Sequence, residues 1–292
     1  MKLGVGLPTF LGNVVSASDV LDWARVADDA GFHSVAVHDK PYHDTWEPLA
    51  ALAAVAAVTK RVRLVTGALL LPTRDEALVA KQAAVIDQVS DGRLDLGVAL
   101  GARAEDFELF GRSMKGRGAT FERQVQRLLD LWAAAQETRE TGAEPGPASV
   151  QEPHVKLWIG GYTDEAITRA VKYGDGYIFG APGVAALAAR IPLIREAARA
   201  AGRDDFPVQG LAYILPSEDP EELAEGERLL TRYYKHLHKP YPELVHQGSA
   251  EQLIAKLKEY ETTGIDVLNV IPVARTMGPL ERLAADVLPA FR

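Results

Sequence analysis

The chain has 292 residues, of which 47% are hydrophobic and 25% are charged, as in ordinary soluble globular proteins. Its formal net charge of −8 argues against a nucleic-acid or anionic-membrane surface as a partner. Cysteine is absent, which excludes disulfides, thiol catalysis and cysteine-ligated zinc, and fits a cytoplasmic location. The longest apolar run, Pro48 to Val58, is too short to span a bilayer, and the amino terminus is better explained as a first strand than as a signal peptide.

Strand and helix patterns alternate from one end of the chain to the other. Short apolar runs predict eight strands, centred near Val5, Val35, Leu64, Leu96, Trp158, Ile178, Leu211 and Leu268. An alanine-rich segment between the third and fourth strands is predicted to be a helix. Further helices are expected near residues 20–30, 47–59, 120–136, 166–173, 185–201, 220–238, 249–262 and 280–290. Ser18-Asp19 is the expected cap of the first helix, and the SAEQ segment at Ser249 resembles a capping box.

Eight successive βα units in a chain of this length predict a (β/α)8 TIM barrel, with a doubly wound open sheet as the alternative. The polar, Gly- and Pro-rich segment near 137–152 is predicted to be a flexible surface excursion, so residues 1–292 are expected to form one domain. In parallel α/β folds, ligands bind at the carboxyl ends of the strands. The third and fourth strands end in LLLPTRDE and ALGARAED, and we expect the site there.

Several standard catalytic motifs are absent or incomplete. Gly4-Val5-Gly6 lacks the third glycine and the helix of a dinucleotide fingerprint, and Gly111 to Gly116 lacks the Lys-Ser/Thr pair of a P-loop. Neither a G-x-S-x-G elbow nor an H-E-x-x-H motif occurs. His236 and His238 lie in a strongly charged helical pattern and are expected at the surface.

The loop after the second predicted strand, His38-Asp39-Lys40-Pro41-Tyr42-His43-Asp44, is dense in polar groups. Its two histidines and two aspartates could bind a metal ion, although no other strand end supplies a histidine. The same loop could be a solvated connection in which Asp44 caps the next helix. The third interpretation is a site for an organic cofactor, and the residues of this loop alone leave the three open.

Two glycine turns favour the organic cofactor. Gly160-Gly161-Tyr162-Thr163 follows the fifth predicted strand, and Gly180-Ala181-Pro182-Gly183 follows the sixth; each precedes a helix. Glycine lets backbone N–H groups approach a phosphate at the positive end of a helix. Short βα loops also contain glycine for steric reasons alone. In barrels with a phosphate site the corresponding turns usually follow strands seven and eight.

Longer motifs carry a family resemblance. They are GFHSVAVHDKPYH, WEPLAALAAVAAVTKRVRLVTGALLLPTR, AKQAAVIDQVSDGRLDLGVALGARAEDFELFG, KLWIGG, AVKYGDGYIFG and GSAEQLIAKLKEYETTGIDVLNV. With these motifs, which cover most of its length, the chain resembles the bacterial luciferase-like family of flavin- and F420-dependent oxidoreductases. The resemblance implies a TIM barrel that binds F420 or FMN, with a slight preference for F420, because long insertions of many monooxygenase members are missing. It also implies a homodimer.

The resemblance assigns residues to the cofactor. It implies a bulge at the end of the third strand, often with a non-proline cis peptide, at Gly67-Ala68. It places Asp39 near the ring, and it makes Gly160 and Gly161 the phosphate-binding glycines. With the pocket lining and the two turns, the candidate cofactor residues are Asp39, Gly67, Ala68, Leu100, Gly101, Gly160, Gly161, Tyr162, Thr163, Ala181 and Gly183.

Two positions depart from the family pattern. Lys40 stands where F420-dependent members commonly have histidine, and Ala102 stands where some sugar-oxidising members have an acid. The candidate catalytic residues are His38, His43 and Lys40. The two histidines could exchange a proton near neutral pH, or they could be structural hydrogen-bonding groups. No metal ligands are assigned.

The expected function is hydride transfer or monooxygenation of a small organic substrate. Aromatic residues near the predicted mouth suggest a partly apolar substrate: Phe10, Tyr42, Trp46 and Phe107. The alternatives are an FMN-dependent monooxygenase proper, a cofactor-binding barrel without catalysis, and a metal-dependent hydrolase. The sequence does not identify the substrate.

Overall fold

Eight parallel strands form a closed barrel in the computed structural model, which describes residues 1–10, 15–140, 146–234 and 240–292. Each barrel strand pairs with the next along the chain, and β10 pairs with both β1 and β8, which closes the ring. The barrel strands are β1 Lys2–Gly6, β2 Ser34–Val37, β3 Arg63–Thr66, β5 Leu94–Ala99, β6 Lys156–Gly160, β7 Gly176–Ile178, β8 Val208–Leu215 and β10 Val267–Pro272. The predicted TIM barrel is confirmed, and the open doubly wound sheet is wrong.

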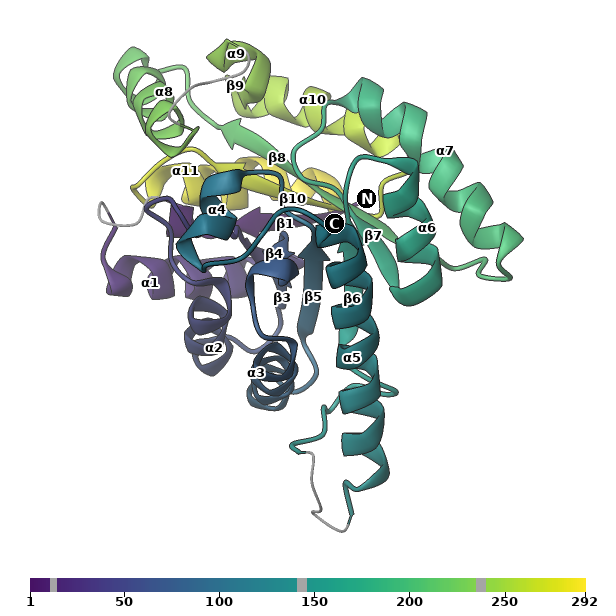
Figure 1. Cartoon of the computed structure of the whole chain (residues 1–292). Coiled ribbons are helices and arrows are strands. Elements are labelled where there is room, and N and C mark those ends of the chain that lie inside the picture. Colours follow the sequence, from purple (N-terminus) through teal and green to yellow (C-terminus); the bar gives the residue numbers. More distant parts are fainter. Residues whose placement is uncertain (11–14, 141–145, 235–239) are drawn as a thin grey trace.

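Helices surround this barrel, and neighbours in the ring contact one another (Figure 1). The ring consists of α1 Ala17–Ala30, α2 Pro48–Val58, α3 Glu76–Val89, α5 Arg117–Glu137, α6 Asp164–Tyr173, α7 Val184–Ala200, α10 Ala250–Thr262 and α11 Gly278–Arg282. Within the described residues, three further α-helices lie in loops at the carboxyl ends of strands: α4 Ala104–Leu109, α8 Pro220–Tyr234 and α9 Tyr241–Leu244. None of the helices within the described ranges is both long and apolar enough to cross a membrane.

The barrel interior is packed in layers. Near the amino ends of the strands, the Ser34 hydroxyl donates to the Asn269 side chain at 2.6 Å, and Asn269 contacts Gln209 at 3.3 Å. Apolar side chains fill the next layer, among them Val65 and Leu211. Because side chains on a strand alternate between its two faces, every second residue of β2 points inward: Ser34, Ala36 and then His38. The strand therefore aims His38 at the mouth of the barrel.

Two short strands in the described part of the chain were not predicted. β4, Leu69–Leu70, continues the line of β3 and pairs with β5. β9, Val245–Gln247, pairs with the outer edge of β8 at Tyr213–Leu215. β7 pairs only with Val208 and Gln209 of β8, and Leu211 donates its N–H to Gly180, so the edge of β8 from Tyr213 onward is open to a further partner. β9 satisfies those backbone groups.

Two local predictions were wrong in detail. The first helix is capped by Ser16 instead of Ser18-Asp19, because Ser16 and Asp19 each accept the other's backbone N–H at 3.1 Å. The last helix does not run unbroken over 280–290: α11 passes into a π-helical turn at Leu283–Val287 and a 3-10 turn at Leu288–Phe291. Pro289 has no N–H to continue the α-helical hydrogen bonds. His236 and His238 lie outside the described residues.

The excursion near 137–152 is anchored at its described end. Residues 141–145 lie outside the described ranges, but the backbone N–H groups of Val150 and Gln151 donate to the Asp87 carboxylate at 2.8 and 3.0 Å. The Gln151 amide donates to the same carboxylate at 2.6 Å. Asp87 on α3 therefore fastens this end of the segment to the outside of the barrel.

Substitution of Gly97 by alanine tests how tightly β5 packs against the end of β3. A Cβ at this position would lie 2.1 Å from the Thr66 carbonyl oxygen, and this backbone atom cannot move without disturbing the strand. We expect G97A to lower the free energy of unfolding by about 1–3 kcal/mol or more. Urea denaturation measures the loss, with G146A as the control, because a Cβ at Gly146 meets nothing within 4 Å. Equal unfolding midpoints for the two variants would contradict this packing.

Candidate functional site

The third barrel strand is interrupted where it reaches the mouth. β3 ends at Thr66 and β4 begins at Leu69, and the peptide bond between Gly67 and Ala68 is cis. Gly67 donates its N–H to the Val37 carbonyl at 2.8 Å, and the Thr66 hydroxyl donates to the Gly97 carbonyl at 2.7 Å. The predicted bulge with a non-proline cis peptide is confirmed. Its backbone lies between the carboxyl ends of β2 and β5.

Asp39 binds the backbone that follows this bulge, at the start of β4. Its carboxylate accepts the Leu70 N–H at 2.8 Å, and both of its oxygens lie 3.0 Å from Nη2 of Arg74. Arg74 in turn contacts Glu47 through Nη1 at 2.7 Å. The Asp39 side chain is only 2% exposed; burial raises its pKa, and the Arg74 guanidinium acts against that rise. Asp39 therefore fixes the position of β4 relative to β2.

His38 lies at the centre of the mouth among aromatic rings. Its ring stacks on Tyr213 of β8 at 6.1 Å between centroids and with 5° between planes, and it meets Phe10 and Tyr233 edge-on. His38 is 8% exposed, and its Nδ1 has no hydrogen-bond partner among the described residues. Burial, with a smaller contribution from the charge of Lys40, lowers the pKa of His38 to about 4. The imidazole is therefore neutral at pH 7.

Lys40 is turned toward the end of α8. It is 1% exposed, and its Nζ donates to the Tyr233 carbonyl. The same ammonium lies 4.1 Å from the centre of the Tyr233 ring and 4.7 Å from that of Tyr234. A cation is favourable at the negative end of a helix and over aromatic faces. Lys40 therefore fastens the last turn of α8 to the loop after β2.

His43 is half-buried in the same loop. Its backbone N–H donates to the Lys40 carbonyl at 2.9 Å, and its ring lies 6.4 Å from that of Tyr233. Asp44 pairs with Arg232 of α8 at 2.8 Å. It does not cap α2, whose cap is Glu47, so the expectation for Asp44 was wrong: the helix begins at Pro48, too far along the chain for Asp44 to reach its first N–H groups.

The first glycine turn has the predicted placement between β6 and α6. Gly160 ends the strand, and Thr163 caps the helix by accepting the Ala166 N–H at 3.4 Å. The Tyr177 hydroxyl donates to the Gly161 carbonyl at 2.7 Å, which orients that peptide. A Cβ at Gly161 would lie 2.5 Å from that of Ala166, so only glycine fits against the start of α6. The turn leaves backbone N–H groups at a helix N-terminus.

The second glycine turn lies beside the first. Gly160 pairs in register with Ile178, and Gly180 follows Ile178 by two residues. The Tyr162 hydroxyl reaches over Gly180, because a Cβ there would be 2.2 Å from it. Ala181 and Gly183 are exposed, and Gly183 caps α7. The register therefore brings the two turns together.

The end of β5, the fourth barrel strand, lies between the Gly67-Ala68 bulge and the Gly160 turn. Leu70 of β4 pairs with Ala99, and Val98 pairs with Ile159 of β6. Leu100 and Gly101, which follow β5, thus lie between the Gly67 bulge and the Gly160 turn, and both are partly exposed. Gly101 has φ 79°, a conformation that favours glycine, and it packs over the buried Phe107.

Some residues at the mouth were missed by the sequence analysis. Tyr213 has a recognisable signal, because it follows Gln209 and Leu211 on the inward face of β8. The others are brought in by contacts between segments far apart in the chain, for which the sequence carries no local pattern: Arg74, Arg103, Tyr233 and Tyr234. No group of three or more His, Cys, Asp or Glu side chains that could hold a metal ion occurs within the described ranges.

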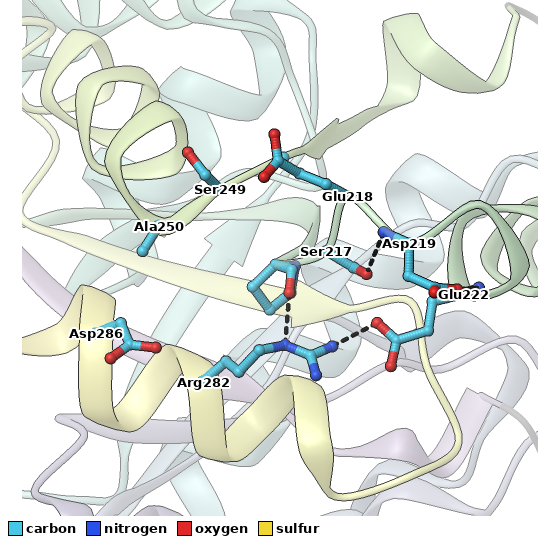
Figure 2. Close-up of a pocket in the computed structure, with 10 residues that line it drawn as sticks. Ser217, Glu218, Asp219, Glu222, Ser249, Ala250, Arg282 and Asp286 are labelled. Carbon is cyan, nitrogen blue, oxygen red and sulfur yellow. Dashed lines mark hydrogen bonds and ion pairs between the residues drawn. The ribbon is translucent and has the colours of Figure 1, made fainter.

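A separate cavity lies outside the mouth (Figure 2). It has a volume of about 470 Å³ and is lined by the loop after β8, the start of α10 and by α11. Arg282 crosses it, with Nε 2.7 Å from the Pro216 carbonyl and Nη2 2.5 Å from Glu222. Ser249 is occupied in the cap of α10. None of the sequence-predicted site residues lines this cavity.

The chain matches the family of luciferase-like monooxygenases over residues 1–266 and belongs to that family. One relative is the oxygenase component of a flavin-dependent trigonelline monooxygenase from Acinetobacter baylyi, 23% identical over 94% of this chain and 89% of that protein. Among solved structures, a monooxygenase from Streptomyces bottropensis aligns over all of both chains with a TM-score of 0.83 and 22% identity. An F420-dependent secondary alcohol dehydrogenase aligns over all of both chains with a TM-score of 0.77 and 21% identity. The chain thus has the same fold as a monooxygenase and as an F420-dependent dehydrogenase.

The lowered pKa of His38 predicts a pH-dependent stability. The unfolded chain takes up a proton near pH 6.5 and the folded chain only near pH 4, so stability is complete above pH 6.5 and is lost progressively as the pH falls toward 4. His33 and His246 contribute in the same direction. We expect H38Q to show a smaller loss of unfolding free energy between pH 7 and pH 4.5 than the parent chain, measured by urea denaturation. An unchanged loss would show that His38 is not held neutral by burial.

Proposed function

We propose that this chain is an oxidoreductase that binds a flavin or deazaflavin ring against the Gly67-Ala68 bulge and transforms a small, partly apolar organic substrate. The observation that carries the proposal is the position of the bulge beside His38, whose buried Nδ1 has no partner among the described residues. A buried, unpaired nitrogen is costly unless a ligand or water satisfies it. A ring system with polar edges would satisfy it.

The proposed cofactor-binding residues follow the edge of the barrel. Gly67 and Ala68 would contact the ring, with Asp39 holding the bulge in place through Leu70. Leu100 and Gly101 would lie under the linker between ring and phosphate. The N–H groups of the first turn would hold the phosphate, and the second turn would flank it: Gly160, Gly161, Tyr162, Thr163, Ala181 and Gly183. Asp164 at the start of α6 would oppose an anion, but Arg190 pairs with it at 2.9 Å and offsets its charge.

The bound cofactor would supply hydride transfer or oxygen activation, and the protein would supply position, exclusion of water and a proton. We assign the proton to His38. Its stacking on Tyr213 fixes the ring plane, and Phe10 and Tyr233 keep water away from it. A neutral imidazole can donate or accept at neutral pH, whereas a protonated one could only donate.

The other two candidate catalytic residues have different proposed roles. Lys40 would act indirectly, because its ammonium contacts the Tyr233 carbonyl and two aromatic rings of α8. His43 would line the rim beside Tyr42. The absence of a histidine at position 40 favours a second candidate function, a barrel that binds cofactor without turnover.

FMN and F420 are the two candidate cofactors for this site. The flavin-dependent trigonelline monooxygenase supports a flavin, for which FMN is the candidate, whereas the compact length of the chain suggested F420. The preference for F420 stays a prediction. A single domain and a cytoplasmic location are also proposals; the pairing of β1 with β10, which joins the two ends of the chain, supports the first, and the lack of cysteine supports the second.

Titration of the purified protein with FMN and with F420, followed by absorbance and equilibrium dialysis, tests the function. We expect at least one of them to bind, and T163D to weaken FMN binding about tenfold or more, because aspartate keeps the helix cap but repels the phosphate. Riboflavin, which has no phosphate, should bind both proteins equally. T168D, one turn further along α6 and also exposed, is the control and should bind FMN like the parent.

Failure of both cofactors to bind would overturn the proposal. With reduced cofactor, oxygen uptake distinguishes a monooxygenase from a hydride-transferring enzyme, which consumes none. Tight binding without turnover of aldehydes, alcohols or enones would favour the non-catalytic barrel.

We also propose that the chain forms a homodimer through α2 and α3. α2 has no charged residue, which is typical of a helix buried on several sides. α3 exposes three large apolar side chains, Leu78, Val85 and Val89, at 56%, 43% and 51%. An apolar groove of about 210 Å³ lies between the two helices. The same face of a second copy, related by a two-fold axis, would cover these groups.

Charge substitutions on α3 test the dimer. V85E and V89E together should convert a dimer into a monomer, because two glutamates cannot be buried in an apolar interface without a partner. Multi-angle light scattering after size exclusion gives the mass of each form. L193E, at an apolar side chain of α7 that is 46% exposed, should remain dimeric. A parent chain that is monomeric at micromolar concentration would contradict the proposal.

A further inference from the structure

Arg103 lies above the mouth of the barrel, in the loop after β5 and directly before α4. It is half-buried, and its guanidinium carbon lies 5.9 Å from the centre of the Tyr234 ring. The Tyr234 hydroxyl lies 2.9 Å from that of Tyr213, and Tyr213 stacks on His38. A continuous series of contacts thus joins Arg103 to the proposed proton-handling residue.

The charge of Arg103 differs from that of other cations at the mouth. Arg74 forms ion pairs with Asp39 and Glu47, and Arg232 forms one with Asp44. Lys40 is enclosed by Tyr233 and Tyr234. Among the described residues, no carboxylate forms an ion pair with Arg103.

Two acids lie on the first turn of α4, directly after Arg103: the partly exposed Glu105 and the buried Asp106. The Asp106 carboxylate is 1% exposed and accepts the Tyr42 N–H at 3.1 Å. Burial raises the pKa of Asp106, while the Tyr42 N–H and the charge of Arg103 act against that rise. Asp106 is therefore engaged with the loop after β2, and the fork of the Arg103 guanidinium is left for another partner.

We propose that Arg103 determines substrate specificity by binding the carboxylate of an organic acid whose flat, apolar body lies over His38 and Tyr213. A guanidinium matches a carboxylate with two parallel hydrogen bonds. Desolvation at the mouth strengthens such a pair, and in a chain of net charge −8 a local cation also draws anions to this position. The aromatic rings below it suit an aromatic or unsaturated acid. The inference rests on the proposed function, because the acid is the substrate of that same site.

Aromatic acids and their neutral amides test the proposal. Isothermal titration measures binding of benzoate, phenylacetate and 2-naphthoate, each beside its carboxamide, to the protein loaded with whichever cofactor binds. In the parent chain we expect at least one acid to bind about tenfold more tightly than its amide. R103Q should bring the two affinities within about twofold, and R103K should give an intermediate ratio, because it keeps the charge but loses the fork.

R112Q is the matched control. It removes the same positive charge from the protein as R103Q, but Arg112 is exposed and lies beyond the end of α4. It should keep the preference for the acid. Absence of any preference in the parent chain, or an equal loss in R112Q and R103Q, overturns the proposal. So does absence of binding by all three acids.

The cofactor's own phosphate is the other anion that Arg103 could bind. FMN and riboflavin titrations of R103Q decide this: unchanged affinities support a substrate role, whereas a selective loss of FMN binding assigns Arg103 to the cofactor and overturns the inference. If no cofactor binds to the parent chain, the proposed function fails by itself, and the acid and amide titrations can still be made on the protein alone.

Discussion

The site depends on the interruption of the third barrel strand. A continuous β3 would direct Gly67 and Ala68 into the ladder with β5, but the chain leaves the sheet after Thr66 and returns at Leu69. Two side chains compensate for the break: Thr66, the last residue of β3, donates its hydroxyl to the Gly97 carbonyl of β5, and Asp39, after β2, accepts the Leu70 N–H of the returning segment. The ladder is thereby opened without leaving these backbone groups unsatisfied.

The same strand ends explain why the mouth is aromatic and dry. The inward positions of β2 and β8 end in His38 and Tyr213, which stack on one another. α8 then brings Tyr233 and Tyr234 over them, and Lys40 fastens the last turn of that helix. A buried lysine is tolerated there because a carbonyl and two aromatic faces surround its ammonium. Lys40 is thus part of the wall of the mouth.

Local patterns in the sequence were sufficient for the barrel and for much of its rim. Apolar runs locate every barrel strand, because parallel strands are buried on both faces, and glycines after β6 and β7 mark the two turns. The bulge and Asp39 came from the family resemblance. The sequence could not assign three residues to the mouth: Arg74, Tyr234 and Arg103. Their places depend on contacts across 30 or more residues of chain, such as that of Arg74 with Asp39. The capping of α1 by Ser16 and the break after α11 depend on hydrogen bonds that composition alone does not specify.

The three basic residues around His38 have different electrostatic consequences. Asp39 neutralises Arg74, and the ammonium of Lys40, although enclosed, contributes to the lowered pKa of His38. Arg103 keeps its charge without an ion pair among the described residues. On the proposals above, an acid bound by Arg103 would bring a negative charge beside the Tyr234 and Tyr213 pair and would favour the protonated form of His38. Substrate charge and proton transfer would be coupled through one ring, whose plane Tyr213 already fixes.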